Sequence, residues 1–202
     1  MNSSNSKLLF SRYPEMFKNA HDLKQSLMGF GFECGDGWFN LINTLLAHAY
    51  YPVGQLKHKL EELPSKIEEN PEGPPSYYGV ESWGKYEEKL RKELKIALKN
   101  LPVLVQVKEK FGTLRIYTHG GDSAFQAQIE LAESLSGQTC EECGAPGFRA
   151  GPGWIRTLCA EHFEERHGAE RLVEVAQAMA AASILEEYFK GADFLKKESD
   201  DC

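Results

Sequence analysis

The chain has 202 residues, of which 42% are apolar and 26% are charged, the composition of a soluble globular protein with enough apolar side chains for a core. Its net charge of −7 argues against a protein whose main task is to coat duplex DNA or an anionic membrane. The chain begins with polar residues and has no run of about 18 apolar residues, so we expect a cytoplasmic protein without a membrane span.

The first hundred residues are predicted to be mainly helical. Because proline ends a helix begun before it, a helix is expected only after Pro14. Another helix should begin near Asp36 and end at Tyr51-Pro52, since its apolar residues recur at a spacing near 3.6. Residues 68–76 form a Pro-rich loop, a linker or flap, and residues 83–98 follow as an amphipathic helix.

The stretch 29–39 contains four glycines among aromatic residues, which indicates close backbone approach or positive φ. Two interpretations stay open. The aromatic residues plug a core, or they line a pocket. In the pocket, Trp38 would stack on a planar ligand, and Glu33 or Asp36 would accept hydrogen bonds from its hydroxyl or amine groups.

A β-hairpin is predicted next, because residues 103–110 and 113–118 are strand-like and Phe111-Gly112 lies at their join. A period of two separates two faces. The apolar face is expected to carry Val103, Val105, Val107, Leu114 and Ile116. The opposite face carries Lys108, Arg115 and Tyr117, which is either an anion site or an ordinary solvated sheet face.

Four candidate metal ligands follow, namely Cys140 and Cys143, then fifteen intervening residues, then Cys159 and His162. Two residues separate the members of each pair, and the interval between the pairs is rich in glycine and proline, so both pairs can converge on one ion. Three thiolates and an imidazole favour zinc. With four protein ligands there is no open position for water, so the predicted zinc is structural.

These elements together predict an α+β fold, mostly helical, with a hairpin-based antiparallel sheet and a treble-clef-like zinc finger, packed as one body over residues 1–202. The parts expected are a helical part at 1–100, a hairpin plus helix at 101–136, the zinc finger at 137–168 and a long helix at 169–195. The apolar side of that last helix is too wide to face water, so it should pack on the N-terminal helices or on a second copy in a homodimer.

Three stretches, residues 33–42, 106–117 and 140–147 together with Thr157-Leu-Cys159 and His162, resemble a family of small, uncharacterised phage and prophage proteins. The resemblance implies a viral accessory protein acting in the cytoplasm of a bacterial host. Accessory proteins of this kind often counter host defence, either by sequestering a nucleotide-type immune signal or by binding a defence protein.

Three classes of function fit the sequence. The first is a non-enzymatic protein that holds a small anionic, nucleotide-like ligand in a pocket between the 29–39 turn and the 103–118 hairpin. The second is a zinc-finger adaptor that contacts a host protein or nucleic acid through Arg149, Arg156 and Arg166. The third is an enzyme, which ranks last because it rests on isolated acids and histidines, namely Glu33, Asp36, His48 and His119.

Overall fold

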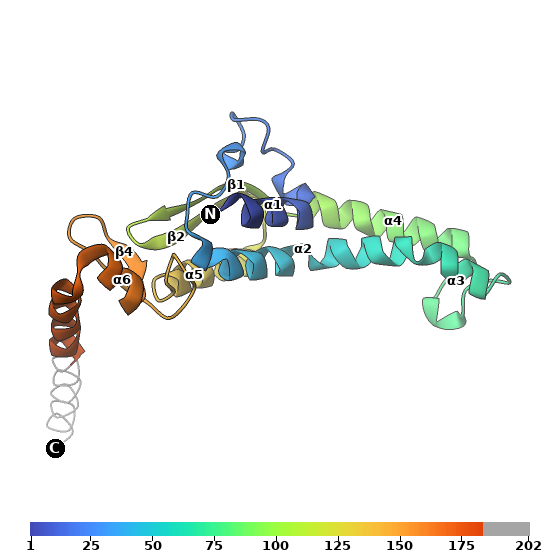
Figure 1. The fold of residues 1–202 in the computed structure, drawn as a ribbon. Helices are drawn as coiled ribbons and strands as arrows, with labels where there is room; N and C mark the ends of the chain where they lie inside the picture. Colours follow the sequence, from blue (N-terminus) through green and yellow to red (C-terminus); the bar gives the residue numbers. More distant parts are fainter. Residues whose placement is uncertain (184–202) are drawn as a thin grey trace, which may run out of the picture.

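The computed structural model describes residues 1–183 and shows a mostly helical protein with two antiparallel two-stranded sheets, as the sequence predicts (Figure 1). The helices are α1 (Ser3–Arg12), α2 (Phe39–Glu61), α3 (Leu63–Glu69), α4 (Trp83–Asn100), α5 (Ser123–Ser136) and α6 (Ala160–His167). The strands are β1 (Val103–Lys110), β2 (Thr113–His119), β3 (Phe148–Ala150) and β4 (Arg156–Leu158). Short 3₁₀ turns lie at η1 (Pro14–Phe17), η2 (Met28–Phe30), η3 (Asp36–Trp38) and η4 (Ser76–Tyr78).

The predicted helix boundaries are wrong at Pro14 and at Pro52. Helix α1 precedes Pro14, and only the single turn η1 follows it. Helix α2 continues through Pro52 to Glu61. The ring of Pro52 is solvent-exposed, and the next residue, Val53, is buried in the core. Packing of the surrounding turns therefore outweighs the backbone hydrogen bond that proline cannot make.

The main core lies between α1, α2, α5 and the β1–β2 hairpin. Helices α1 and α2 and both strands contribute fully buried side chains, namely Leu9, Ile42, Leu46, Leu104, Val107 and Leu114. Helix α5 contributes Phe125 and Ile129, which are almost fully buried. Burial of such aliphatic and aromatic side chains contributes about 1.5–3 kcal/mol each relative to exposure.

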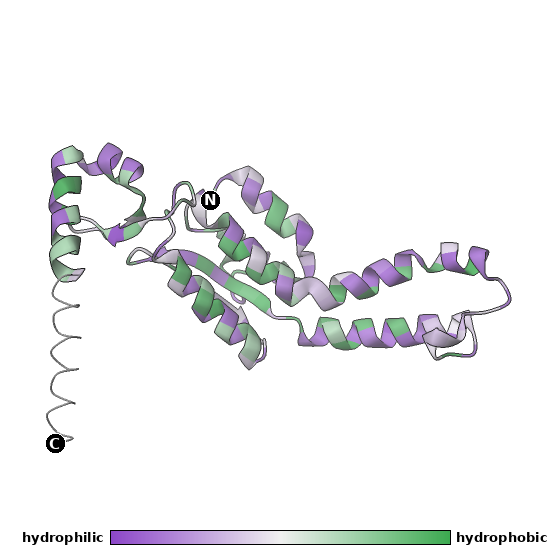
Figure 2. Cartoon of the chain, turned by 90° about the horizontal axis from the view of Figure 1, so that it is seen from below, coloured by the Kyte–Doolittle hydropathy of each residue, from purple (hydrophilic) through white to green (hydrophobic). Residues whose placement is uncertain are grey.

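Helices α2 and α4 run side by side and extend beyond this core as an arm, whose tip is formed by α3 and the segment 70–82 (Figures 1 and 2). A separate apolar cluster of Leu63, Trp83, Tyr86 and Leu90 holds the tip together. The indole N–H of Trp83 donates to the carbonyl of Asn70 at 2.8 Å. The predicted Pro-rich loop is therefore part of a folded arm tip, with the end of α3 inside the predicted loop.

Strict alternation along β1 is interrupted by a bulge between Leu104 and Gln106. Leu104 and Val107 enter the core, whereas Val105 is only half-buried and its carbonyl accepts from the backbone N–H of Leu27 at 2.7 Å. The prediction that Val105 shares the core face is therefore wrong. A bulge adds one residue to the strand and shifts the face of every residue before it.

The outer edge of β2 is covered by side chains of α5. The N–H of Leu114 donates to the hydroxyl of Ser136 at 2.8 Å, and the N–H of Ile116 donates to the carboxylate of Glu133 at 2.9 Å. Edge strands expose unpaired backbone groups, and these two contacts satisfy them without a further strand.

The helical segment 169–183 leaves the metal-ligand region and points away from α1 and α2 (Figures 1 and 2). Leu172 and Val175 pack beside Phe163 of α6, whereas Val173 and Met179 are about half exposed. Packing of this segment on the N-terminal helices, one of the two predicted arrangements, is therefore wrong, and the predicted dimer contact stays a prediction. The part of the predicted helix beyond residue 183 lies outside the described residues. Among the described helices, none has the length and apolarity needed to cross a membrane.

We predict that Ser136→Ala lowers the free energy of unfolding by about 1–3 kcal/mol, because it leaves the buried N–H of Leu114 without an acceptor. The matched control is Ser134→Ala, which removes an exposed hydroxyl from the same helix and should change stability by less than about 0.5 kcal/mol. Urea denaturation of both variants measures the difference, and equal effects would contradict the role assigned to Ser136.

Candidate metal centre

The four predicted ligands come together in space. One ligand atom from each of Cys140, Cys143, Cys159 and His162 lies within 4.8 Å of the others. The Nδ1 atom of His162 is 3.6 Å from the sulfur of Cys140 and 3.1 Å from that of Cys159, and the sulfurs of Cys143 and Cys159 are 3.9 Å apart. These four side chains are therefore close enough to bind one metal ion.

Local backbone structure brings each ligand into place. The first pair lies on a tight turn in which the N–H of Gly144 donates to the carbonyl of Cys140 at 2.9 Å. We call residues 140–144 the knuckle. Strand β4 ends directly before Cys159, which caps α6, and His162 lies in the first turn of that helix. Phe163, the next residue, is fully buried against Phe148 of β3, so the ligand helix is fixed to the small sheet.

The surroundings of Cys140 favour its thiolate form. Burial opposes ionisation, but the backbone N–H groups of Cys143, Cys159 and Glu142 donate toward the sulfur and lower the pKa of Cys140 to about 7. A thiolate is the form that binds a soft metal ion. Cys34 contrasts with it, because burial raises the pKa of that thiol to about 12 and keeps it protonated.

The knuckle rests directly on the backbone of the Gly35-Asp36-Gly37 turn. A Cβ atom at position 37 would lie 2.1 Å from the carbonyl oxygen of Cys140, and one at position 35 would lie 2.2 Å from that of Glu141. The N–H of Gly37 donates to the carbonyl of Glu141 at 2.8 Å. Only glycine permits this approach, so the close backbone contact predicted for the 29–39 stretch is made with the metal centre.

A buried ion pair fastens the same junction. Glu141, whose side chain is 5% exposed, accepts from the N–H of Gly35 at 2.9 Å and from Arg156 at 2.9 and 3.0 Å. A charged pair at this depth is maintained only when its hydrogen bonds are complete, and here both carboxylate oxygens are used. The sequence did not indicate a role for Glu141, since its partner lies fifteen residues further along the chain, on strand β4.

Trp38 belongs to the core and not to a ligand pocket. Its ring is 0% exposed, and its indole N–H donates to the carbonyl of Thr139 at 2.8 Å. A buried indole has no face available for stacking, so the pocket role for Trp38 is wrong and the alternative of a core plug is correct. Trp38 thereby forms another link between the 29–39 turn and the segment that leads into the knuckle.

The two carboxylates of the turn bind other parts of the chain. Asp36 accepts from the backbone N–H of Asn2 at 2.9 Å and from the side-chain amides of Asn2 and Asn5 at 3.0 Å, which lower its pKa against a desolvation effect of opposite sign. Glu33 bridges to β1 through its backbone, donating to the carbonyl of Val107 at 3.0 Å. Its carboxylate accepts from Gln106 at 2.7 Å. The turn and the hairpin are therefore neighbours, as the predicted pocket required.

Lys108, Arg115 and Tyr117 do share one face of the hairpin. Lys108 and Arg115 are direct cross-strand partners, and the Lys108 ammonium lies 5.3 Å from the centre of the Tyr117 ring. Arg115 has a distant carboxylate partner, Glu133, at 3.7 Å. Tyr117 is 44% exposed, so this face is accessible to solvent.

A hollow of about 620 Å³ lies where the 33–35 segment, the hairpin and the metal unit meet. Its charged lining consists of the N-terminal ammonium of Met1 and the side chains of Glu33, Glu109, Glu141, Arg156 and Arg166. Both arginines are already paired with carboxylates, Arg156 with Glu141 and Glu142 and Arg166 with Glu142. The ammonium of Met1 donates to the carbonyls of Phe32 and Cys34, so each cation of this lining already has a partner and the hollow is unsuited to an anion.

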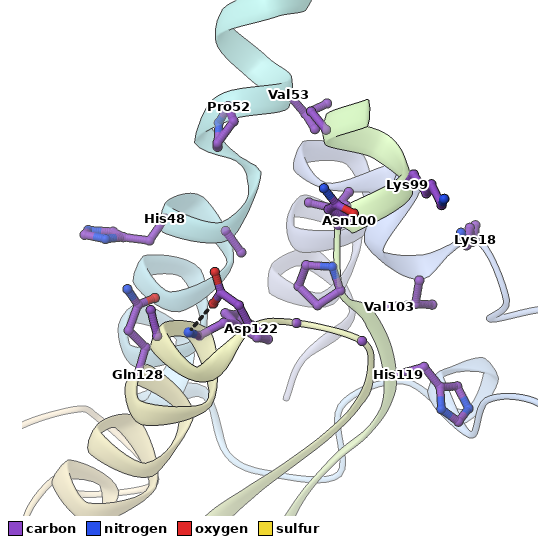
Figure 3. Close-up of a pocket in the computed structure, with 18 residues that line it drawn as sticks. Lys18, His48, Pro52, Val53, Lys99, Asn100, Val103, His119, Asp122 and Gln128 are labelled. Carbon is purple, nitrogen blue, oxygen red and sulfur yellow. Dashed lines mark hydrogen bonds between the residues drawn. The ribbon is translucent and has the colours of Figure 1, made fainter. Parts of the chain in front are cut away.

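A larger hollow of about 840 Å³ lies at the root of the arm (Figure 3). His48 on α2 and His119 at the end of β2 line opposite sides of it, so they do not form a catalytic pair (Figure 3). Lys18 and Lys99 lie on the same side as His119. Asp122 accepts from the N–H of Phe125 at 2.8 Å, so its carboxylate caps α5.

Comparison of the chain with protein-family models, with curated proteins and with solved structures finds no match.

We predict that Gly37→Ala destabilises the protein by about 1–3 kcal/mol or more, because the added methyl group overlaps the knuckle backbone. Gly84→Ala is the matched control, since position 84 is helical, exposed and without neighbours within 4 Å, and alanine there should stabilise by about 0.5–1 kcal/mol. Thermal melts of the metal-loaded proteins compare the two. A loss of stability at position 84 equal to that at 37 would contradict the assignment.

Proposed function

We propose that this protein is a zinc-stabilised binding protein, with a structural zinc ion held in a treble-clef-like unit and a small anionic ligand held on the outer face of the hairpin. The zinc proposal rests on the donor set, three cysteines and one histidine whose ligand atoms lie within 4.8 Å of one another. Soft thiolates in a compact four-ligand set suit zinc better than magnesium or calcium. The closed ligand set supports a structural ion over a catalytic one.

We expect one zinc ion per chain in the purified protein, measured by elemental analysis. Cys143→Ser should abolish stoichiometric zinc and destabilise the metal unit, because zinc binding supplies roughly 10–16 kcal/mol in zinc-finger peptides. Cys34→Ser provides the control, since that thiol lies outside the cluster and its loss should leave one zinc per chain. Zinc retained in full by the Cys143 variant would refute the ligand assignment.

The observation that carries the anion proposal is the cross-strand pairing of Lys108 with Arg115. Like charges directly opposite each other destabilise a sheet, and an anion bound between them removes that cost. Tyr117 beside them offers a half-exposed ring on which a base can stack. Lysine, arginine and an aromatic ring thus supply the contacts that a nucleotide phosphate and base require.

The role that we propose follows from this ligand class and from the resemblance to phage proteins. Sequestration of a nucleotide-type immune signal would make the protein a counter-defence factor in the cytoplasm of a bacterial host. Such a role needs binding without turnover. In keeping with this, the histidines of the enzyme alternative lie apart and Asp36 is engaged with Asn2 and Asn5.

We predict that Arg115→Ala weakens binding of nucleotides by at least about tenfold, because charge-assisted hydrogen bonds are worth about 1.5–3 kcal/mol. Calorimetry against a panel of cyclic and ADP-ribose-type nucleotides makes the measurement. Arg91→Ala on the arm is the control and should bind as the unaltered protein does. A third variant, Lys18→Ala, removes a cation from the hollow at the arm root. If it abolishes binding while Arg115→Ala does not, the ligand lies in the hollow at the arm root and the hairpin assignment is wrong.

An adaptor function is the second candidate, and one observation favours it. Trp154 is 72% exposed in the loop between β3 and β4, and it lines the smaller hollow together with Arg166. Exposed tryptophan and arginine are the residue types most often found at binding hot spots. Arg156, which the sequence suggested as a contact residue, is less suited because its side chain is 16% exposed and held by both Glu141 and Glu142, whereas that of Arg166 is 48% exposed and pairs with Glu142 alone. A calorimetric panel without any nucleotide binding would favour this candidate.

A further inference from the structure

The arm carries its charges in two separate blocks. Residues 59–88, which comprise the tip and the adjoining turns of α2 and α4, contain eight glutamates and three lysines and thus a net charge of −5. Residues 89–100, the C-terminal two thirds of α4, contain five cations and one glutamate and thus a net charge of +4. In a chain of net charge −7, a block of +4 over twelve residues is a strong local departure.

Internal ion pairs account for only part of this charge. Glu62 pairs with Lys66, Glu81 with Lys85 and Glu87 with Arg91, all as neighbours along the helices. The remaining charged side chains have no ion-pair partner within residues 1–183 and are exposed. Within residues 59–88 they are Lys59, Glu61, Glu68, Glu69, Glu72 and Glu88. Within residues 89–100 they are Lys89, Lys92, Glu93, Lys95 and Lys99.

Four of the five lysines of α4, namely Lys89, Lys92, Lys95 and Lys99, form a ridge on one side of the helix. Spacings of three and four residues place them opposite the buried Leu90 and the half-buried Leu94, which face α2. The lysine ridge, Lys89 to Lys99, therefore points away from the protein and spans about 15 Å along the helix. Ile96, 53% exposed, lies within it, and the most exposed large apolar side chain of the tip is Tyr77 at 81%.

We propose that the arm pairs with the arm of a second copy in antiparallel orientation, so that the acidic tip of each copy covers the lysine ridge of the other. A twofold axis across the arm brings both complementary contacts together at once, because each copy supplies the same two patches. The pairing also allows Tyr77 of one copy to approach Ile96 of the other, which adds apolar contact to charge complementarity.

A second copy fits these observations better than a nucleic acid does. A polyanion pairs with the lysine ridge but leaves the acidic residues 59–88 without a partner. When it extends along the arm, it is repelled by the net charge of −5 that those residues carry. A second copy satisfies both blocks. This inference is independent of the metal centre and of the ligand proposed for the hairpin.

The experiment measures the mass of the full-length, metal-loaded protein by light scattering at about 50 mM and about 500 mM salt. The ridge variant is Lys89→Glu/Lys92→Glu, and the tip variant is Glu68→Lys/Glu69→Lys. The control, Lys7→Glu/Lys24→Glu, makes the same change in net charge as the ridge variant, at exposed sites outside the arm. Circular dichroism checks that all variants fold.

We expect a dimer at low salt whose dissociation constant rises at least about tenfold at high salt, since screening weakens contacts between exposed charges. The ridge and tip variants should each be monomers, their equimolar mixture should be a dimer, and the control should behave as the unaltered protein. A monomer at low salt overturns the proposal. Dimers that persist in both variants also overturn it, and place the contact elsewhere, for example on the helix at 169–183. Binding of a labelled DNA duplex by a monomeric protein, lost in the ridge variant, overturns it in favour of a nucleic-acid partner.

Discussion

The structure depends above all on the direct contact between two pieces of backbone, the Gly35-Asp36-Gly37 turn and the knuckle at 140–144. Side chains at positions 35 and 37 would overlap carbonyl oxygens at little more than 2 Å, so the contact exists only because both residues are glycine. Backbone hydrogen bonding to Glu141, the buried Glu141–Arg156 pair and the Trp38 indole on Thr139 surround it. The four candidate metal ligands are therefore attached to the main core through this junction.

This junction connects the parts that carry the proposed functions. The same turn pairs with the edge of β1 through Glu33 and holds the start of α1 through Asp36. The hairpin reaches the metal unit again where Thr157 of β4 donates to the carbonyl of Gly112 at the hairpin turn. A bound metal would thus stabilise the position of the strand that presents Lys108, opposite Arg115. The arm does not depend on this junction in the same way, since its tip has a separate apolar cluster and lies at the far end of α2 and α4 (Figure 1).

Local patterns in the sequence predicted what local physics determines. The ligand spacing from Cys140 to His162, the hairpin with Phe111-Gly112 at its join and the amphipathic helix after Trp83 are all present as expected. The errors arise where distant residues decide. Pro52 lies inside a helix because packing holds the turns around it, and the bulge at Val105 breaks the alternation that assigned it to the core. Trp38 suits a ligand site or a core equally well by type, and only its position against Thr139 shows that it is buried.

Amide hydrogen exchange with and without a zinc chelator can show whether metal binding and the glycine turn form one cooperative unit. The N–H of Gly37 donates to Glu141, and that of Gly144 donates to Cys140 within the knuckle. The account predicts that both amides lose protection together when the metal is removed, while Leu90 in the arm keeps its protection. Protection that persists at Gly37 while it is lost at Gly144 would contradict the account.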